Sequence, residues 1–202
     1  NPPAAETMLA ACGAAGIREV KLGYWLYKQP GYWQQADAIR VALEGFQRLA
    51  QKHGVRVAVH THSDAFFGLN ASAAMHLVKG FDPRFVGVYL DPGHLSINGE
   101  PIRMAVDIVR EHLCLVAVKA MIYVRTEKDG QVTWPHKLVP LREGLVNWHE
   151  TMRALRDVGY DGPLTLHSEY ENVSLDELRL LTCDDLAYIK GILSATPTTD
   201  NR

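Results

Sequence analysis

The feature that most constrains the fold of this chain is an alternation of short, almost wholly apolar runs with longer segments of helical periodicity. The apolar runs span residues 16–23, 55–62, 86–91, 113–124 and 164–167. The helical segments between them span residues 36–54, 70–80, 101–113 and 148–159. Runs without a polar face are typical of strands that are buried on both sides, as in a parallel sheet. The pattern therefore predicts an α/β protein, either an open doubly wound sheet or part of a (β/α) barrel of the TIM type with helices outside.

Composition limits the class of partner. The chain has 202 residues, 47% of them hydrophobic, so we expect one domain over residues 1–195 and a disordered tail over 196–202. A net charge of -2 without a block of like charge argues against nucleic acid and against a membrane surface as partners. A small-molecule ligand is the remaining expectation.

Cysteine usage and the chain start bear on the compartment. Cys12, Cys114 and Cys183 are widely spaced and form no CxxC, which argues against a disulfide framework and against a structural zinc site. A reducing, cytoplasmic location is expected. No apolar run reaches the roughly 18 residues that a membrane span needs. The chain starts at Asn1 without an initiator Met or a signal-peptide pattern, so we expect the true N-terminus to be absent.

Ionisable side chains gather where the predicted strands end. These residues are His60 and His62, Asp91 followed by His94, Lys119, and His167 with Glu169. Side chains alternate along a strand, and in both candidate architectures the carboxyl ends of parallel strands carry the chemistry. Imidazoles, carboxylates and an amine are therefore predicted to share one cavity. Imidazole with carboxylate suits Mn, Zn, Fe, Co or Ni.

Simpler interpretations of the same residues stay open. Asp91 also suits a helix cap or turn before Pro92, and His62 suits a cap for the loop that follows. Lys119 also suits a structural partner of Asp91, and Glu169 an exposed residue. The remaining histidines are expected to be surface or hydrogen-bonded structural residues: His53, His76, His112, His136 and His149.

Four stretches carry a resemblance to a known family: HGVRVAVHTH, VGVYLDPGHLSINGE, LVAVKA and VPLREGLVNWHETMRALRDVGYDGPLTLHSEYE. In them the chain resembles the xylose-isomerase-like superfamily of TIM barrels, the sugar phosphate isomerase/epimerase family, over about residues 5–193. The resemblance implies a barrel of eight strands. This chain matches only the last five βα units, so a partial barrel is expected, lacking the first strands.

The same resemblance implies one divalent metal ion held by strand-end residues, commonly Glu, Asp, His and Glu. His60 stands where the first Glu is usual, Asp91 matches, and Ala117 replaces the third ligand. His167 takes the last position, with Glu169 as a nearby substitute. A divalent ion (Mn, Zn, Co or Mg) would then rest on His60, Asp91 and His167 or Glu169. Alternatively the site is metal-free and Lys119 neutralises Asp91.

For function, the resemblance implies a sugar isomerase or epimerase, or a lyase or dehydratase. Such an enzyme would act on a sugar, polyol or keto-sugar by metal-assisted proton abstraction. The expected catalytic residues are His60, Lys119 and Glu169. The expected substrate contacts are His62, His94, Tyr24 and Trp25, with Phe66 adding to an apolar wall.

The sequence also allows two functions other than a sugar isomerase or epimerase. A truncated barrel that has lost its chemistry would serve as a binding or assembly module. Its sheet would have open edges near Val20 and Leu166, so we expect a homo-oligomer or pairing with a missing N-terminal segment. An abasic-site endonuclease of the same superfamily is disfavoured by the near-neutral charge and by too few metal ligands.

Overall fold

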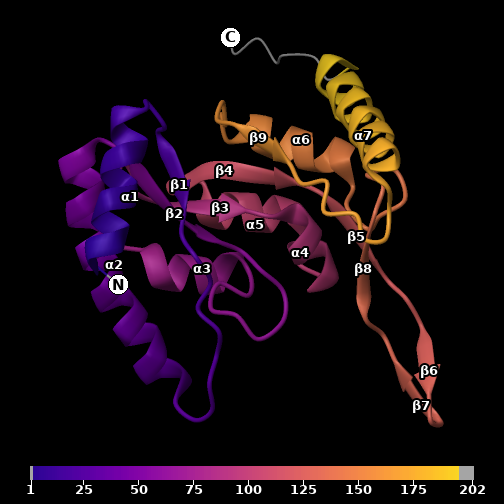
Figure 1. Ribbon diagram of the computed structural model, residues 1–202, viewed down its shortest axis with the longest axis horizontal. Coiled ribbons are helices and arrows are strands. Elements are labelled where there is room, and N and C mark those ends of the chain that lie inside the picture. Colours follow the sequence, from indigo (N-terminus) through magenta and orange to yellow (C-terminus); the bar gives the residue numbers. More distant parts are fainter. Residues whose placement is uncertain (1, 196–202) are drawn as a thin grey trace.

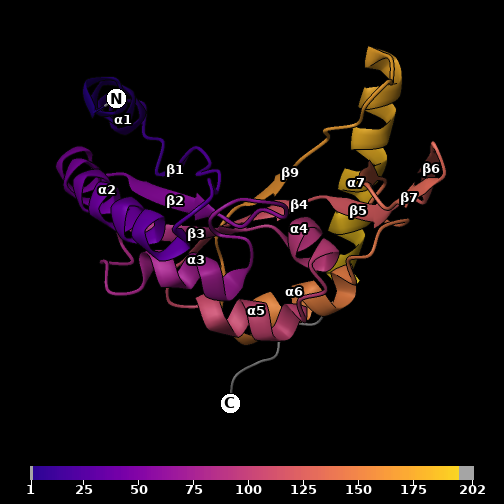
Figure 2. The same cartoon turned by 90° about the horizontal axis from the view of Figure 1, so that it is seen from below.

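Five parallel strands form the main sheet of the computed structural model, which describes residues 2–195 (Figure 1). The strands are β1 (Glu19–Lys21), β2 (Arg56–His60), β3 (Val86–Leu90), β4 (Leu113–Val118) and β9 (Leu164–Leu166). They pair in the order β1-β2-β3-β4-β9, every pair parallel. Figure 2 shows that the sheet curls and that helices line its outer side. The predicted partial barrel with five parallel strands is confirmed.

Four helices connect successive strands and cover the outer face: α2 (Tyr32–His53), α3 (Ala71–Val78), α5 (Ile102–Val109) and α6 (Trp148–Asp157). Their ends follow local chemistry. The side chain of Asn70 accepts a hydrogen bond from the N–H of Ala73, which caps α3. Gly54 ends α2 with a φ of 66°, a conformation that favours glycine. Pro101 is the N-cap of α5.

The sheet has two packed faces. On the outer face, strand residues such as Val59, Val88 and Val116 pack against the helices and are at most 1% exposed. The inner face forms a second cluster of buried residues that comprises Ala58, Tyr89, Cys114, Leu115 and Ala117. Burial on both faces explains why the strands carry no polar side in the sequence. It also stabilises the curled sheet, since each buried Val or Leu contributes about 1.5–3 kcal/mol.

Antiparallel strands form an arm that the sequence pattern did not predict. The predicted strand 113–124 is in fact two strands, because β5 (Ala120–Tyr123) leaves the main sheet after Lys119 and pairs with β8 (His136–Val139). Beyond this pair, β6 (Thr126–Lys128) and β7 (Gln131–Thr133) form a hairpin that projects from the body (Figure 1). The turn at Asp129 and Gly130 lies at its tip.

Two helices lie at the ends of the curl. α1 (Pro2–Ala14) packs against α2, and α7 (Leu175–Ala195) follows β9 (Figure 2). A capping box begins α7, because Glu177 accepts hydrogen bonds from the backbone and hydroxyl of Ser174. The expected disordered tail, residues 196–202, lies outside the described residues. As expected, β1 and β9 are the two edge strands of the sheet.

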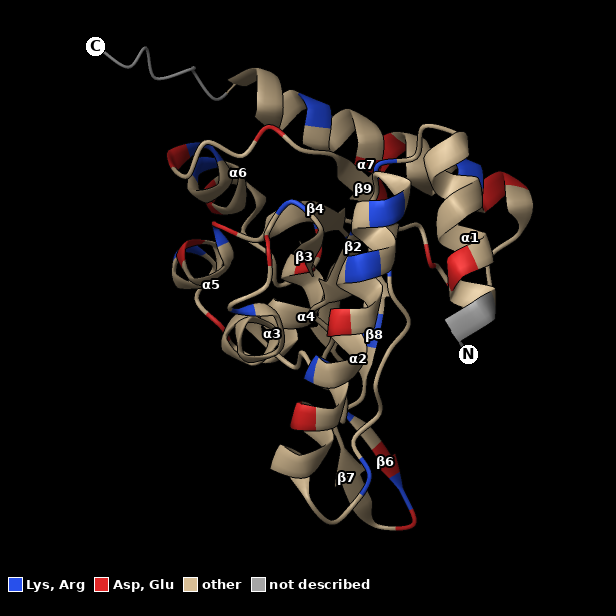
Figure 3. Cartoon of the chain, turned by 90° about the vertical axis from the view of Figure 1, so that its left-hand side faces the viewer, with Lys and Arg blue, Asp and Glu red and all other residues tan. Residues whose placement is uncertain are grey.

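Figure 3 shows that positions of Lys or Arg and of Asp or Glu are interspersed along the helices of the side that it presents. Within residues 2–195, every helix is too short or too polar to pass through a membrane.

Candidate functional site

The predicted site residues meet at the carboxyl ends of the strands. His60 is the last residue of β2, Asp91 follows β3, Lys119 lies between β4 and β5, and His167 follows β9. The parallel register brings these ends to one mouth. Asp91 is 0% exposed, His60 3% and Lys119 4%, so three ionisable groups are buried together. Buried charges persist when they are paired, and the contacts show that they are.

Asp91 is the centre of the site. Its Oδ2 atom lies 3.1 Å from Nε2 of His60 and 3.1 Å from Nζ of Lys119. Its Oδ1 atom accepts a hydrogen bond of 3.1 Å from the backbone N–H of His94, so Asp91 is also the N-cap of α4 (Pro92–Ile97). The cap and the predicted site role coexist in one carboxylate, whose two oxygens serve different partners. The structure also shows that Lys119 is an ion-pair partner of Asp91.

Electrostatics fixes the charge state of this pair. Burial favours the neutral acid, but the hydrogen bond from His60 and the charge of Lys119 outweigh it and hold the pKa of the Asp91 carboxyl below its usual range. Burial lowers the pKa of His60, against the opposing effect of Asp91. A carboxylate only accepts hydrogen bonds, so Nε2 of neutral His60 carries the proton. Its Nδ1 then accepts from the hydroxyl of Tyr24, at 2.9 Å.

Lys119 also links Asp91 to residues that follow β9. Its Nζ lies 3.3 Å from Oε2 of Glu169, and Oε1 of Glu169 lies 3.4 Å from Nδ1 of His167. Burial raises the pKa of Tyr89 to about 12, so its hydroxyl stays protonated and donates to Nε2 of His167 at 2.6 Å. Burial lowers the pKa of His167. Glu169 is exposed, as one interpretation expected, yet it contacts the buried ammonium.

A pair of stacked imidazoles forms a second part of the site. The ring centroids of His62 and His94 lie 3.7 Å apart. Ser63 holds both rings, because its carbonyl accepts from Nδ1 of His62 and its hydroxyl bonds Nδ1 of His94, each at 2.8 Å. Burial lowers the pKa of His94 to about 2 and also lowers that of His62. Nε2 of His94 is buried and has no hydrogen-bond partner among the described residues, which marks it as a point for a ligand.

These side chains border a cavity of about 840 Å³, a volume typical of small-molecule sites. His62, His94, Lys119 and Glu169 line it, together with β8 and residues 169–173. His136, which was expected to be structural, also lines it, and its Nε2 lies 3.2 Å from Oδ2 of Asp64. Sequence reasoning missed His136 because the pairing of β5 with β8 carries no apolar periodicity.

The aromatic residues divide between the rim and the core. Tyr24 contacts His62 and Phe66, with ring centroids 4.7 and 5.3 Å apart, so these three residues form a wall beside the stacked imidazoles. Trp25 packs instead against the hydrophobic core. The substrate contacts predicted for Tyr24 and Trp25 stay predictions.

The donor set does not fit the expected metal ion. Among residues 2–195, no group of three or more His, Cys, Asp or Glu side chains is arranged to hold one. His60 meets Asp91, and His167 meets Glu169, but the ammonium of Lys119 lies between the two carboxylates. Ala117, at the position of the third ligand, offers only a methyl group.

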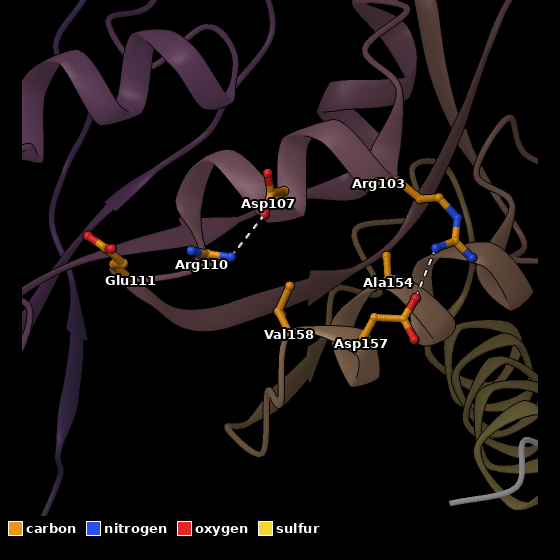
Figure 4. Close-up of a pocket in the computed structure, with 7 residues that line it drawn as sticks. All are labelled: Arg103, Asp107, Arg110, Glu111, Ala154, Asp157 and Val158. Atoms are coloured by element: carbon orange, nitrogen blue, oxygen red, sulfur yellow. Dashed lines mark hydrogen bonds and ion pairs between the residues drawn. The ribbon is translucent and has the colours of Figure 1, made fainter. Parts of the chain in front are cut away.

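A second hollow lies away from the mouth, between α5 and α6 (Figure 4). Its arginines are already paired, Arg103 with Asp157 at 2.9 Å and Arg110 with Asp107 at 3.4 Å. Because both arginines are matched by carboxylates on an exposed surface, the hollow offers no unpaired arginine to a ligand. The mouth of the sheet is therefore the candidate site.

Comparisons with known proteins agree with this fold. The sequence profile of the xylose isomerase-like TIM barrel family matches residues 4–191. A xylose isomerase domain protein from Planctomyces limnophilus is 18% identical with a TM-score of 0.71, over 95% of this chain and 63% of that one. An L-ribulose 3-epimerase is 17% identical with a TM-score of 0.73, over 96% and 67%.

Two further similarities are informative. A xylose isomerase-like TIM barrel protein from Mycobacterium smegmatis, solved in complex with magnesium, is 19% identical with a TM-score of 0.65, over 96% of this chain and 67% of that one. An uncharacterised protein of Methanocaldococcus jannaschii is 21% identical over 123 residues, which are 60% of this chain and 39% of that protein. The chain thus spans less than two thirds of the length of the Planctomyces and Methanocaldococcus proteins.

Proposed function

This chain belongs to the xylose isomerase-like TIM barrel family, and we propose that it is a sugar isomerase- or epimerase-like enzyme that moves a proton next to the carbonyl of a sugar or keto-sugar. The observation that carries this proposal is the meeting of a carboxylate, an ammonium and neutral imidazoles at one cavity of about 840 Å³. The structural neighbours include a D-psicose 3-epimerase, an L-ribulose 3-epimerase and a D-tagatose 3-epimerase-like protein.

The first step is removal of a proton from the carbon beside the carbonyl. Glu169 is the proposed base, because its carboxylate lines the cavity and is partly open to solvent. The electron pair of the broken C–H bond moves toward the carbonyl oxygen and gives an enediolate. Lys119 stabilises that oxygen with the N–H that its two ion pairs leave over, since an ammonium has three donors. Delivery of a proton to the opposite face of the same carbon completes epimerisation. Delivery to the former carbonyl carbon, with the neighbouring hydroxyl proton passing to the former carbonyl oxygen, completes isomerisation.

The imidazoles hold the reacting groups in place. Both ring nitrogens of His60 are engaged, by Tyr24 and Asp91, so we assign it a positioning role. It fixes the carboxylate that faces Lys119. Nε2 of His94 is the group left to meet a substrate hydroxyl. His62 and Tyr24 then face the apolar side of the sugar.

The test measures exchange of the carbon-bound proton with solvent. A panel of ketoses and keto-sugars is incubated with the protein in D₂O, and NMR monitors the exchange. Glu169→Gln is expected to slow exchange about 10²–10⁴-fold, the usual contribution of a general base. Glu171→Gln is the matched control, because Glu171 lines the same cavity without contacting Lys119. Equal exchange rates in wild type and Glu169→Gln would refute the assignment of the base.

An assembly module is the second candidate, favoured by the edge strands β1 and β9. In that case a second copy or a further segment would extend the sheet. Sugar binding without proton exchange, together with a stable oligomer in light scattering, would favour it.

The three free thiols, on Cys12, Cys114 and Cys183, agree with the proposed reducing, cytoplasmic compartment.

A further inference from the structure

The ammonium of Lys119 lies where the family resemblance expects a divalent ion. Its Nζ is 3.1 Å from Oδ2 of Asp91 and 3.3 Å from Oε2 of Glu169. Both carboxylates were predicted as metal ligands, and they come from separate strands. One side-chain cation thus contacts two groups that an ion would bridge, and it does so in a buried place, since Lys119 is 4% exposed.

Two neighbouring residues also disfavour the binding of a metal ion. Ala117 is fully buried and brings no donor from β4. His60 directs Nε2 at Oδ2 of Asp91, and this nitrogen carries the proton because the carboxylate only accepts. A nitrogen that binds a metal must be free of its proton. The tautomer of His60 that suits Asp91 is therefore the wrong one for coordination.

We propose that Lys119 is a built-in replacement for the divalent ion, so that the site is filled by a side-chain cation and excludes a metal ion. An entering ion would displace Lys119 from Asp91 and leave a buried ammonium without its carboxylate, which is strongly unfavourable. This inference concerns what occupies the site. It holds whether or not the proposed isomerisation is correct.

The experiment measures uptake of Mn²⁺ and Co²⁺ by chelator-treated protein, by calorimetry and by the spectra of the bound ions, with the melting temperature as a second readout. Wild type is expected to take up no stoichiometric ion and to melt at an unchanged temperature. Lys119→Met leaves Asp91 and Glu169 uncovered, so it should melt lower. An added ion should then raise its melting temperature by about 5 °C at a hundredfold excess over Kd.

A designed ligand set sharpens the test. Ala117→His combined with Lys119→Met supplies a third donor, and it should bind the ion at least tenfold more tightly than Lys119→Met alone. The matched control is Asp91→Asn with Lys119→Met, which removes both charges together. It is expected to fold, because loss of a whole buried pair is far milder than loss of one partner, and to bind no ion.

Two results would overturn the proposal. One is uptake of one equivalent of Mn²⁺ or Co²⁺ by wild type that Asp91→Asn abolishes. The other is failure of the Ala117→His, Lys119→Met variant, folded by circular dichroism, to take up an ion. If Lys119→Met does not fold, wild type and the two double variants still decide the matter. Since neither readout is turnover, the result is independent of the test of Glu169.

Discussion

The hydroxyl of Ser63 lies 2.8 Å from Nδ1 of His94, and both residues are buried. Ser63→Ala removes the partner of Nδ1 and leaves an unsatisfied nitrogen in the interior. We expect the free energy of unfolding to fall by about 1–3 kcal/mol in urea denaturation. Ser96→Ala is the control. Ser96 lies on α4, as His94 does, and its hydroxyl donates to a backbone carbonyl at a partly exposed position. An equal loss in both variants would contradict the special role of Ser63.

Burial of His94 makes stability depend on pH. Its pKa is lowered to about 2 in the folded chain, against about 6.5 in an unfolded one. Below pH 6.5 only the unfolded chain takes up this proton. The contribution of His94 to the free energy of unfolding is therefore full above pH 6.5 and is lost as the pH falls. At pH 5 the loss is about 2 kcal/mol relative to pH 7.

The check on His94 is a comparison of urea denaturation at pH 7 and pH 5 for wild type and His94→Gln. The variant should lose about 2 kcal/mol less than wild type between the two pH values, because glutamine takes up no proton. Other buried histidines contribute equally to both proteins and cancel in the difference. The same loss in both proteins would show that His94 titrates normally in the folded state.

The main sheet and the meeting of the site residues were predictable from sequence. Strands buried on both faces read as unbroken apolar runs, and this signal located all five parallel strands. The alternation of side chains placed His60 and Asp91 on one face, and they lie 3.1 Å apart. The sequence did not decide the partner of Asp91, because a metal ion and the ammonium of Lys119 are both compatible with the predicted positions of the side chains. Only the distances distinguish them.

Other elements gave no usable signal. β6 and β7 are exposed along their whole length, so they lack the apolar periodicity that predicts a strand. The break between β4 and β5 at Lys119 falls inside a continuous apolar run, which concealed it. His136 comes to the cavity through that unpredicted pairing. Local composition does not encode contacts of this kind, which arise from the tertiary fold.

The packing of α1 on α2 depends on a glycine. A Cβ at Gly13 would lie 2.2 Å from the carbonyl oxygen of His53, a backbone atom that cannot move aside cheaply. Gly13→Ala is therefore expected to destabilise the chain by about 1–3 kcal/mol. Gly45→Ala within α2 should instead stabilise it by up to about 1 kcal/mol, because its Cβ meets only the end of Arg48 at 3.9 Å. Thermal denaturation of both variants checks the contrast, and stabilisation by Gly13→Ala would contradict this contact.

Asp185 on α7 supports the wall of the cavity from behind. It is 4% exposed, and its Oδ1 accepts from the backbone N–H of Leu141 at 2.9 Å while Oδ2 accepts from the hydroxyl of Tyr170. Asp185→Ala leaves the buried N–H of Leu141 without a partner, so we expect a loss of about 2 kcal/mol in the free energy of unfolding. Residues 169–173, which line the cavity, lose their anchor at the same time.

The consequence for the site is measurable by hydrogen exchange. In Asp185→Ala the amides of Leu141 and of residues 169–173 should exchange faster than in wild type, while those of β2 and β3 stay protected. Asp184→Ala is the control, since Asp184 is the exposed neighbour on the same helix. Tyr170→Phe removes one of the two bonds and should show the smaller change. If Asp185→Ala leaves exchange at Leu141 unaltered, the wall is held by other contacts and Asp185 is not its anchor.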